Sequence, residues 1–281
     1  MVTLINSIAT IADQFDAIVF DQWGVLHDGQ DPYPAALGAL SDLKGCAAKL
    51  GVLSNSGKRA ASNADRIGAK GFDVDQFDIV MTSGEALWNT FALEETQVQT
   101  LYPIQGSPDD AAEWSFGLSV QIVDAIDDVD AILLMGLPDG SKQADYDVVL
   151  QTGLDRQLPL YCSNPDLTSP RSGGTYVMSP GVLAQRYQDM GGTVHLYGKP
   201  YGPIFAAMQT ALDCRPERIL MIGDSLHHDI KGAHDAGWAS LLIRAGIHAP
   251  DIDEQSVVAD IAQLASAAGV VPPTFSLPDL R

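Results

Sequence analysis

The sequence predicts an α/β protein: a parallel sheet with helices on both faces, interrupted by a second, smaller α/β domain. The first observation is that short apolar runs alternate with amphipathic stretches, as in parallel strands joined by helices. The second is that several apolar runs end in a polar residue followed by turn residues, which is typical of buried strands. The third is the length of 281 residues, enough for one large domain or two smaller ones.

Residues 1–83 carry the start of this pattern. The apolar run 18–20 ends at Asp21, and we interpret it as a buried strand with a carboxylate at its carboxyl end. Spacings of three and four residues indicate helices, whereas short apolar runs indicate strands. In order, we expect a helix at 3–14, a strand at 18–21, a helix at 34–49, a strand at 51–53, a helix at 59–69 and a strand at 77–81.

The block 84–193 differs from the first part in its sequence pattern, and we interpret it as a second α/β unit. Its strand candidates are 99–104, 120–123, 131–135 and 159–162. The pattern of the first part resumes after it, with strands expected at 193–197, 218–222 and 238–244, and helices at 203–212, from 228 or 229 to 237, and at 256–268. We therefore expect a core domain of residues 1–83 and 194–281 and an inserted cap domain of residues 84–193.

The charge composition argues against nucleic acid and anionic membranes as binding partners. With 16 Lys and Arg against 36 Asp and Glu, the net charge is −20, so nucleic acid and anionic membrane surfaces are poor partners. The three cysteines are far apart and form no metal or disulfide pattern. The N-terminal stretch lacks the features of a signal peptide, and no apolar run approaches the length of a membrane span. We expect a cytoplasmic protein.

Polar side chains follow four of the expected strands, and they include carboxylates, a hydroxyl, an amide and an ammonium group. They are Asp21; Ser54 and Asn55; Lys199; and Asp224 with Asp229. We expect these strands to be neighbours in one sheet, so that the groups converge at one edge. Carboxylates there would suit Mg²⁺, and one of them could act as a nucleophile toward a phosphoryl group. Each residue taken singly is also compatible with a cap, turn or surface position.

The order and spacing of these motifs carry a resemblance to a known family. The four segments are Asp21-Gln-Trp-Gly-Val-Leu, Leu53-Ser-Asn-Ser, Gly198-Lys-Pro and Ile222-Gly-Asp-Ser-Leu-His-His-Asp. Together they resemble the four motifs of the haloacid dehalogenase (HAD) superfamily. The position of the insert resembles class IIA, which includes nitrophenyl-phosphate, pyridoxal-phosphate and sugar phosphatases. The resemblance implies a Rossmann-like parallel-sheet core with an inserted α/β cap.

The resemblance also implies a role for each motif residue. Asp21 would be the nucleophile and a Mg²⁺ ligand, together with the carbonyl of Trp23 and with Asp224, while Asp229 would support the metal site. Ser54 and Asn55 would bind the substrate phosphate. Lys199 would neutralise the nucleophile and the transition state, and residues 164–166 would belong to the hinge between core and cap.

Trp23 departs from the family pattern, because phosphatases of this superfamily usually carry a second Asp at that position. That Asp protonates the leaving group, whereas an indole N–H only donates a hydrogen bond and does not titrate usefully. His27, His227 and His228 are candidates to replace it, and each is also compatible with a purely structural role.

We expect a Mg²⁺-dependent phosphatase of a small phosphorylated metabolite, such as a sugar or cofactor phosphate, acting through an aspartyl-phosphate. The alternatives are a dehalogenase-like hydrolase of a non-phosphate bond and a catalytically weak protein that binds a phosphorylated ligand. Trp23 keeps both alternatives open, while Lys199 and the Asp224 and Asp229 pair favour the metal enzyme. A homodimer formed through the cap is a further expectation.

Overall fold

The structure, a computed structural model, describes residues 2–170 and 175–280. The chain forms two compact units. Unit 1 comprises Met1–Ser54, Ala64–Met81 and Phe205–Arg281, and unit 2 comprises Asn55–Asn63 and Thr82–Ile204. The domain limits expected from the sequence stay a prediction, while the compact units place residues 55–63 and 194–204 in unit 2.

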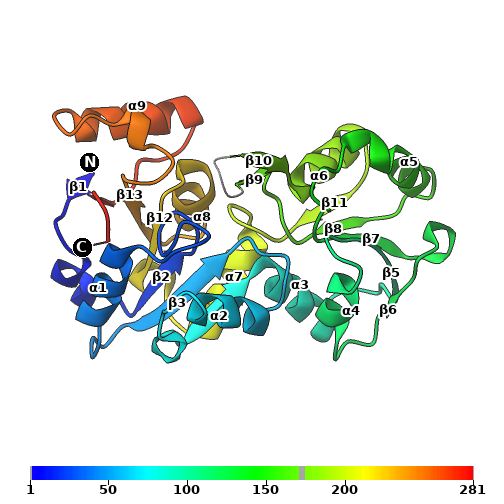
Figure 1. The fold of residues 1–281 in the computed structure, drawn as a ribbon, viewed down its shortest axis with the longest axis horizontal. Helices are drawn as coiled ribbons and strands as arrows, with labels where there is room; N and C mark the ends of the chain where they lie inside the picture. The colour runs from blue at the N-terminus through cyan, green and yellow to red at the C-terminus, as the bar shows by residue number, and fades with distance from the viewer. Residues whose placement is uncertain (1, 171–174, 281) are drawn as a thin grey trace. The chain divides into compact units, whose positions relative to one another are not determined.

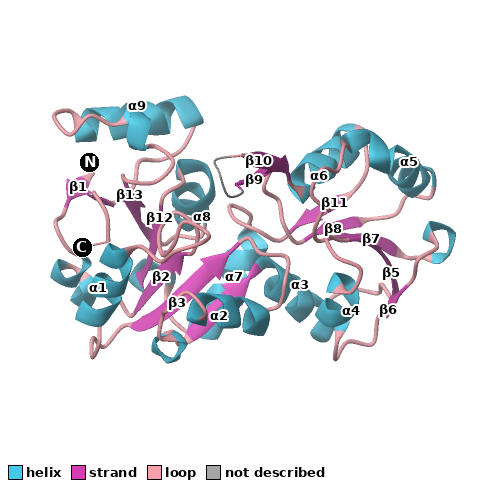
Figure 2. Ribbon diagram, in the orientation of Figure 1, coloured by secondary structure: helices cyan, strands magenta, loops and turns pink. Residues whose placement is uncertain are grey.

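Unit 1 is built on a seven-stranded sheet (Figure 1, Figure 2). Its order is β1 (Thr3–Leu4), β14 (Phe275–Leu277), β13 (Ala239–Ile243), β12 (Ile219–Gly223), β2 (Ala17–Asp21), β3 (Lys49–Ser54) and β4 (Ile79–Thr82). Strand β2, which ends in Asp21, pairs in parallel with β12 on one side and with β3 on the other. The expected α/β class with a parallel, Rossmann-like sheet is therefore confirmed.

Helices cover both faces of this sheet, and the alternation of side chains along the strands explains how. In β13, Leu241 and Ile243 join the same apolar cluster as Leu40, whereas Leu242 between them joins a cluster with Ile261. Strands that bury both faces need apolar residues at successive positions, which is why they read as continuous apolar runs. The helices of this unit are α1 (Pro34–Asp42), α2 (Ala60–Gly68), α7 (Gly202–Leu212), α8 (Lys231–Asp235) and α9 (Val257–Ala268), with α2 and α7 beginning in unit 2.

Three expected helices differ in the structure. The expected helix at 3–14 is wrong: Thr3 and Leu4 form β1, which pairs with β14 from the far end of the chain, and two short 3₁₀ helices follow at Ile8–Thr10 and Ala12–Gln14. The helix expected at 34–49 ends at Asp42. The helix expected from 228 or 229 is instead a π-helical turn at Leu226–Ile230 followed by α8. Further 3₁₀ turns lie at Val74–Gln76, Pro216–Arg218 and Ala249–Asp251.

Unit 2 contains a second sheet of five strands, in which all four pairings are parallel. Its order is β11 (Val194–Leu196), β8 (Leu160–Cys162), β7 (Ala131–Leu134), β5 (Thr100–Ile104) and β6 (Gln121–Ile122). Its helices are α3 (Ser83–Ala92), α4 (Asp110–Ser115), α5 (Asp147–Asp155) and α6 (Pro180–Asp189), with 3₁₀ turns at Ile126–Asp128 and Gln143–Tyr146. Strands β9 (Thr168–Pro170) and β10 (Tyr176–Met178) form an antiparallel pair. The expected α/β character of the middle block is confirmed.

One expectation about sheet membership is wrong. The sequence places the strand before Lys199 in the sheet that carries Asp21, but β11 pairs with β8 in unit 2, with Val194 opposite Leu160. An apolar run identifies a strand without specifying its partner, and β8 provides the free edge that β11 occupies. Among the described residues, no helix combines the length and apolar character that crossing a membrane requires.

Candidate active site

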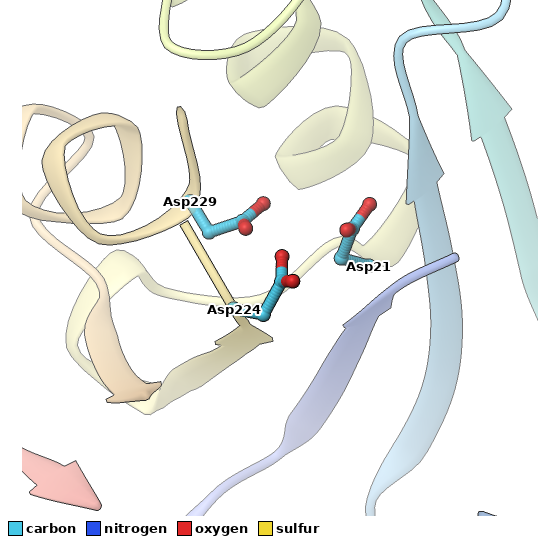
Figure 3. A group of neighbouring side chains, drawn as sticks. All are labelled: Asp21, Asp224 and Asp229. Atoms are coloured by element: carbon cyan, nitrogen blue, oxygen red, sulfur yellow. The ribbon is translucent and has the colours of Figure 1, made fainter. Parts of the chain in front are cut away.

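Three carboxylates meet at the carboxyl end of the unit 1 sheet. Asp21 is the last residue of β2, Asp224 follows β12, and Asp229 lies in the π-helical turn. One carboxylate oxygen from each lies within 4.8 Å of the others, and the three groups turn toward one another (Figure 3). Because β2 and β12 are parallel neighbours with Phe20 opposite Ile222, their ends bring Asp21 and Asp224 together. Three predicted side chains thus gather in one place.

Two glycines make room for the Asp224 carboxylate. A Cβ on Gly24 would lie 2.3 Å from its Oδ2 atom, and a Cβ on Gly246 would lie 2.2 Å from the Asp224 Cβ. Gly24 also has a φ of +84°, which favours glycine. The Ile247 N–H donates a hydrogen bond of 3.1 Å to the same Oδ2 atom. Gly246 and Ile247 are absent from the predicted site, because nothing local in the sequence links them to Asp224.

The π-helical turn places Asp229. The Ser225 carbonyl accepts from the N–H groups of both Asp229 and Ile230, at 3.0 and 3.1 Å, so the turn is wider than an α-helical one. Ser225 also caps the turn, because its hydroxyl accepts from the His228 N–H at 3.1 Å. In return, the Ser225 N–H donates to Asp229 Oδ2 at 3.1 Å. The Asp229 side chain is thereby fixed from its own loop.

Trp23 lies in the loop after β2, and its side chain is 44% exposed. The ring packs edge-on against His27, with 5.8 Å between ring centroids. It also covers Gly29, because a Cβ on that glycine would lie 2.1 Å from the indole Cη2 atom. The position where the family usually has an acid therefore presents an exposed, non-titrating aromatic face. The role of the Trp23 carbonyl as a metal ligand stays a prediction.

His27 is an unsuitable replacement for the missing acid. Its ring is 3% exposed, its Nδ1 atom accepts from the Gly29 N–H at 2.9 Å, and its Nε2 atom lies 3.0 Å from the Gln22 side-chain amide. Burial, reinforced by the charge of Lys70, lowers the pKa of His27 to about 4. A neutral ring held on both nitrogens cannot donate a proton to a leaving group at neutral pH. His27 instead orders the loop that carries Trp23.

Because its pKa is depressed, His27 makes stability depend on pH. Above pH 6.5 the ring is neutral in both states; between pH 6.5 and about 4 only the unfolded chain takes up the proton. We expect the free energy of unfolding to fall by on the order of 3 kcal/mol across this window, and His27→Gln to flatten that part of the profile. Urea unfolding at several pH values measures it. His234→Gln, on an exposed histidine, is the control and should keep the slope; an unchanged slope in His27→Gln would contradict the assignment.

His227 and His228 lie in the π-helical turn beside Asp229, with their rings edge to face and 5.3 Å between centroids. Burial, with smaller contributions from His228 and Lys231, lowers the pKa of His227. A histidine that loses its proton more readily is a better proton donor, provided that it is charged when substrate binds. Both residues stay candidates for the missing acid because of their position, in the turn that also carries Asp229.

The remaining predicted residues are divided between the two units. Ser54 ends β3 in unit 1, one residue after Leu53, which pairs with Asp21. Asn55 and Lys199 belong to unit 2, where the Asn55 side chain bonds the main chain of Lys199. The predicted residues thus form two groups in the structure. One contains Asn55 and Lys199, and the other contains Asp21, Asp224 and Asp229.

Comparisons with known proteins agree with these motifs. Residues 18–113 match the haloacid dehalogenase-like hydrolase family model, and residues 196–269 match a HAD-hydrolase-like model. A solved hydrolase of the haloacid dehalogenase-like family from Brucella suis is 28% identical, with a TM-score of 0.82 over 99% of this chain and 100% of that one. The chain belongs to the haloacid dehalogenase superfamily. It is a hydrolase. Membership of class IIA, which its motifs and the position of its insert indicate, stays a prediction.

Two curated relatives show how far the sequence similarity extends within the HAD superfamily. The human haloacid dehalogenase-like hydrolase domain-containing protein 2 is 27% identical over 248 residues, which are 85% of this chain and 88% of that protein. A dihydroxyacetone phosphatase from Corynebacterium glutamicum is 30% identical over 86 residues, or 31% of each chain. The first similarity covers most of both chains, whereas the second is confined to part of each.

Proposed function

We propose that this HAD hydrolase is a Mg²⁺-dependent phosphatase of small phosphorylated metabolites, sugar or cofactor phosphates, acting through an aspartyl-phosphate on Asp21. The observation that carries the proposal is the gathering of Asp21, Asp224 and Asp229 at one sheet edge, with oxygens within 4.8 Å of one another. The similarity to a dihydroxyacetone phosphatase supports a phosphate ester of a small metabolite as substrate.

The donor set fits a hard divalent cation. Three carboxylates this close concentrate negative charge at one point, which is costly unless a cation or protons compensate it. All the side-chain donors are oxygens, which Mg²⁺ prefers, and Asp224 and Asp229 are held in place by hydrogen bonds from Ile247 and Ser225. Asp21 and Asp224 would hold the ion with the Trp23 carbonyl, and Asp229 would support them. When bound, Mg²⁺ would screen the negative charges of the carboxylates and the phosphoryl group.

The chemistry then falls to residues of this chain. In the first step, a carboxylate oxygen of Asp21 attacks phosphorus and the bond to the leaving oxygen breaks, leaving an acyl phosphate on Asp21. In the second, water attacks phosphorus, the bond to Asp21 breaks and inorganic phosphate leaves. Ser54 would donate to the phosphoryl oxygens, and Lys199 would neutralise their charge. Trp23 supplies no proton in either step.

A substrate screen tests the proposed function. Purified protein is assayed for phosphate release from aryl, acyl, sugar, nucleotide and cofactor phosphates, with Mg²⁺ and with EDTA, beside a haloacid panel assayed for halide release. We expect release from at least one phosphate, abolished by EDTA. Halide release with no phosphate release would instead favour a dehalogenase-like hydrolase, and no turnover on any panel would contradict the proposal.

Removing one carboxylate from the cluster tests the metal assignment. We expect Asp224→Asn to weaken Mg²⁺ binding by at least about tenfold, because it replaces a charged oxygen ligand with a neutral one. Turnover should fall with it, while the fold remains, since Asn keeps an oxygen for the Ile247 N–H. Titration calorimetry gives the affinity, and Asp42→Asn, on an exposed residue of α1, is the control. Equal affinity in Asp224→Asn and the natural protein would place the ion elsewhere.

A further inference from the structure

We propose that Asn55 is a positioning residue that fixes the main chain of Lys199, and that Asp166 sets the orientation of its amide. The consequence for catalysis rests on the proposed function, in which Lys199 neutralises the phosphoryl group. All three residues belong to unit 2. This assigns Asn55 a different task from the phosphate binding expected from the family resemblance.

The Asn55 side chain makes two hydrogen bonds to the main chain of one residue. Its Oδ1 atom accepts from the Lys199 N–H at 2.7 Å, and its Nδ2 atom donates to the Lys199 carbonyl at 3.1 Å. An amide that pairs with both the donor and the acceptor of a residue acts like a neighbouring strand. It therefore fixes the position and direction of the backbone from which the Lys199 side chain starts.

Asp166 determines which way the amide faces. Asn55 Nδ2 donates to Asp166 Oδ1 at 2.7 Å, and a bond to a carboxylate is among the stronger ones a neutral amide makes. With the amide reversed, two oxygens would face each other at that distance, and neither bond to Lys199 could form. An amide nitrogen has two hydrogens, so bonds to Asp166 and Lys199 use both. No amide hydrogen of Asn55 then remains for a phosphoryl oxygen.

The surroundings leave this arrangement little freedom. A Cβ on Gly198 would lie 2.9 Å from Asn55 Oδ1 and 2.2 Å from the Pro165 ring, so only glycine fits before Lys199. Asp166 is itself held, because its N–H donates to Asn164 Oδ1 at 3.1 Å and its carbonyl accepts from the Gly181 N–H at 3.0 Å. Lys199 is only 3% exposed. Restricting the start of this long side chain lowers the entropy lost when its ammonium group binds an anion.

A double-mutant cycle separates positioning from direct phosphate binding. We expect Asn55→Ala to lower kcat by about 10²-fold, in line with the cost of a small misplacement, with a smaller change in KM. In a Lys199→Ala background, Asn55→Ala should cause little further loss, because its effect passes through Lys199. Equal losses in both backgrounds would overturn the proposal and indicate a direct contact with substrate.

Conservative variants test the role of Asp166. Asp166→Asn keeps an oxygen that can accept from Asn55 Nδ2, so it should retain most of the activity that Asp166→Ala loses. Asn55→Asp has the shape of Asn but lacks both donor hydrogens, so it should behave like Asn55→Ala even though the space stays filled. If Asn55→Asp matched the natural protein in kcat, the paired bonds would not matter and the proposal would fail.

Chemical labelling gives a readout that needs no turnover. Brief treatment with acetic anhydride, followed by mass spectrometry, measures the acetylation rate of Lys199 relative to Lys44, whose side chain is 59% exposed. We expect the ratio to rise several-fold in Asn55→Ala and Asp166→Ala and to stay low in Asp166→Asn. An unchanged ratio in Asn55→Ala overturns the positioning role. Failure of the proposed function would show separately, as no phosphate release from the natural protein.

Discussion

Asp21→Asn should lower turnover of every phosphate that the natural protein hydrolyses by at least about 10⁴-fold. Losses of this size are typical when the nucleophile of an enzyme is removed. The amide has nearly the shape of the carboxylate, but its oxygen is far less nucleophilic. Malachite-green detection of phosphate, with enzyme concentration raised to extend the range, measures the loss. Turnover within tenfold of the natural protein would mean that Asp21 is not the nucleophile.

In EDTA, Asp21→Asn should raise the stability of the protein, although it abolishes turnover. Asp21, Asp224 and Asp229 repel one another, with oxygens within 4.8 Å, so removing one charge should raise the free energy of unfolding by about 1 kcal/mol at moderate ionic strength. Added Mg²⁺ should then stabilise the variant less than the natural protein. Asp42→Asn should show neither effect. A variant that is inactive and destabilised under all conditions would have lost its fold and would say nothing of the nucleophile.

The rate should depend steeply on the leaving group, because Trp23 occupies the position of the usual acid. Without a proton donor, the leaving oxygen departs as an anion, so nitrophenyl and acyl phosphates should react about 10²- to 10⁴-fold faster than alkyl phosphates. The second step lacks its base as well, so the aspartyl-phosphate should accumulate and a burst should precede steady turnover. Stopped-flow assays on a series of substituted phenyl and alkyl phosphates measure both.

Restoring the acid gives the matched test. Trp23→Asp should raise turnover of alkyl phosphates and flatten the dependence on leaving-group pKa, while Trp23→Phe, which keeps an aromatic ring, should leave it steep. A natural protein with a flat dependence would contradict the prediction and indicate another acid. Because His27 is buried and neutral at pH 7, His227→Ala and His228→Ala would then be the variants to examine.

The carboxylate cluster could be predicted from the sequence, because each aspartate that ends or follows a strand lies next to the apolar run that identifies that strand. The apolar runs before Asp21 and Asp224 each specify a buried strand, and parallel neighbours bring their ends together. Lys199 shows the limit of this reasoning. The same kind of run precedes it, but β11 joins the sheet of unit 2, and a run of apolar residues does not encode which edge it will pair with.

Other features depend on contacts between distant parts of the chain. The expected helix at 3–14 failed because Thr3 pairs with Phe275, and that pairing outweighs a weak helical spacing. The environment of Asn55 was hidden for the same reason: an amide after a strand suits a phosphate as well as it suits the backbone of Lys199, 144 residues away. Residue type alone does not distinguish these two uses.

The π-helical turn affects how many residues separate Asp224 from Asp229. Between Asp224 and Asp229, the Ser225 carbonyl spans two N–H groups, so this turn holds one residue more than an α-helical turn of the same reach. Deleting either residue 227 or 228 would leave an ordinary α-helical turn of the same reach, in which the Ser225 carbonyl accepts from a single N–H. A homologue whose two aspartates are one residue closer would therefore need only an α-helical turn to present the second carboxylate to the same cluster. In sorting such sequences, a difference of one residue between the two aspartates is compatible with the same site.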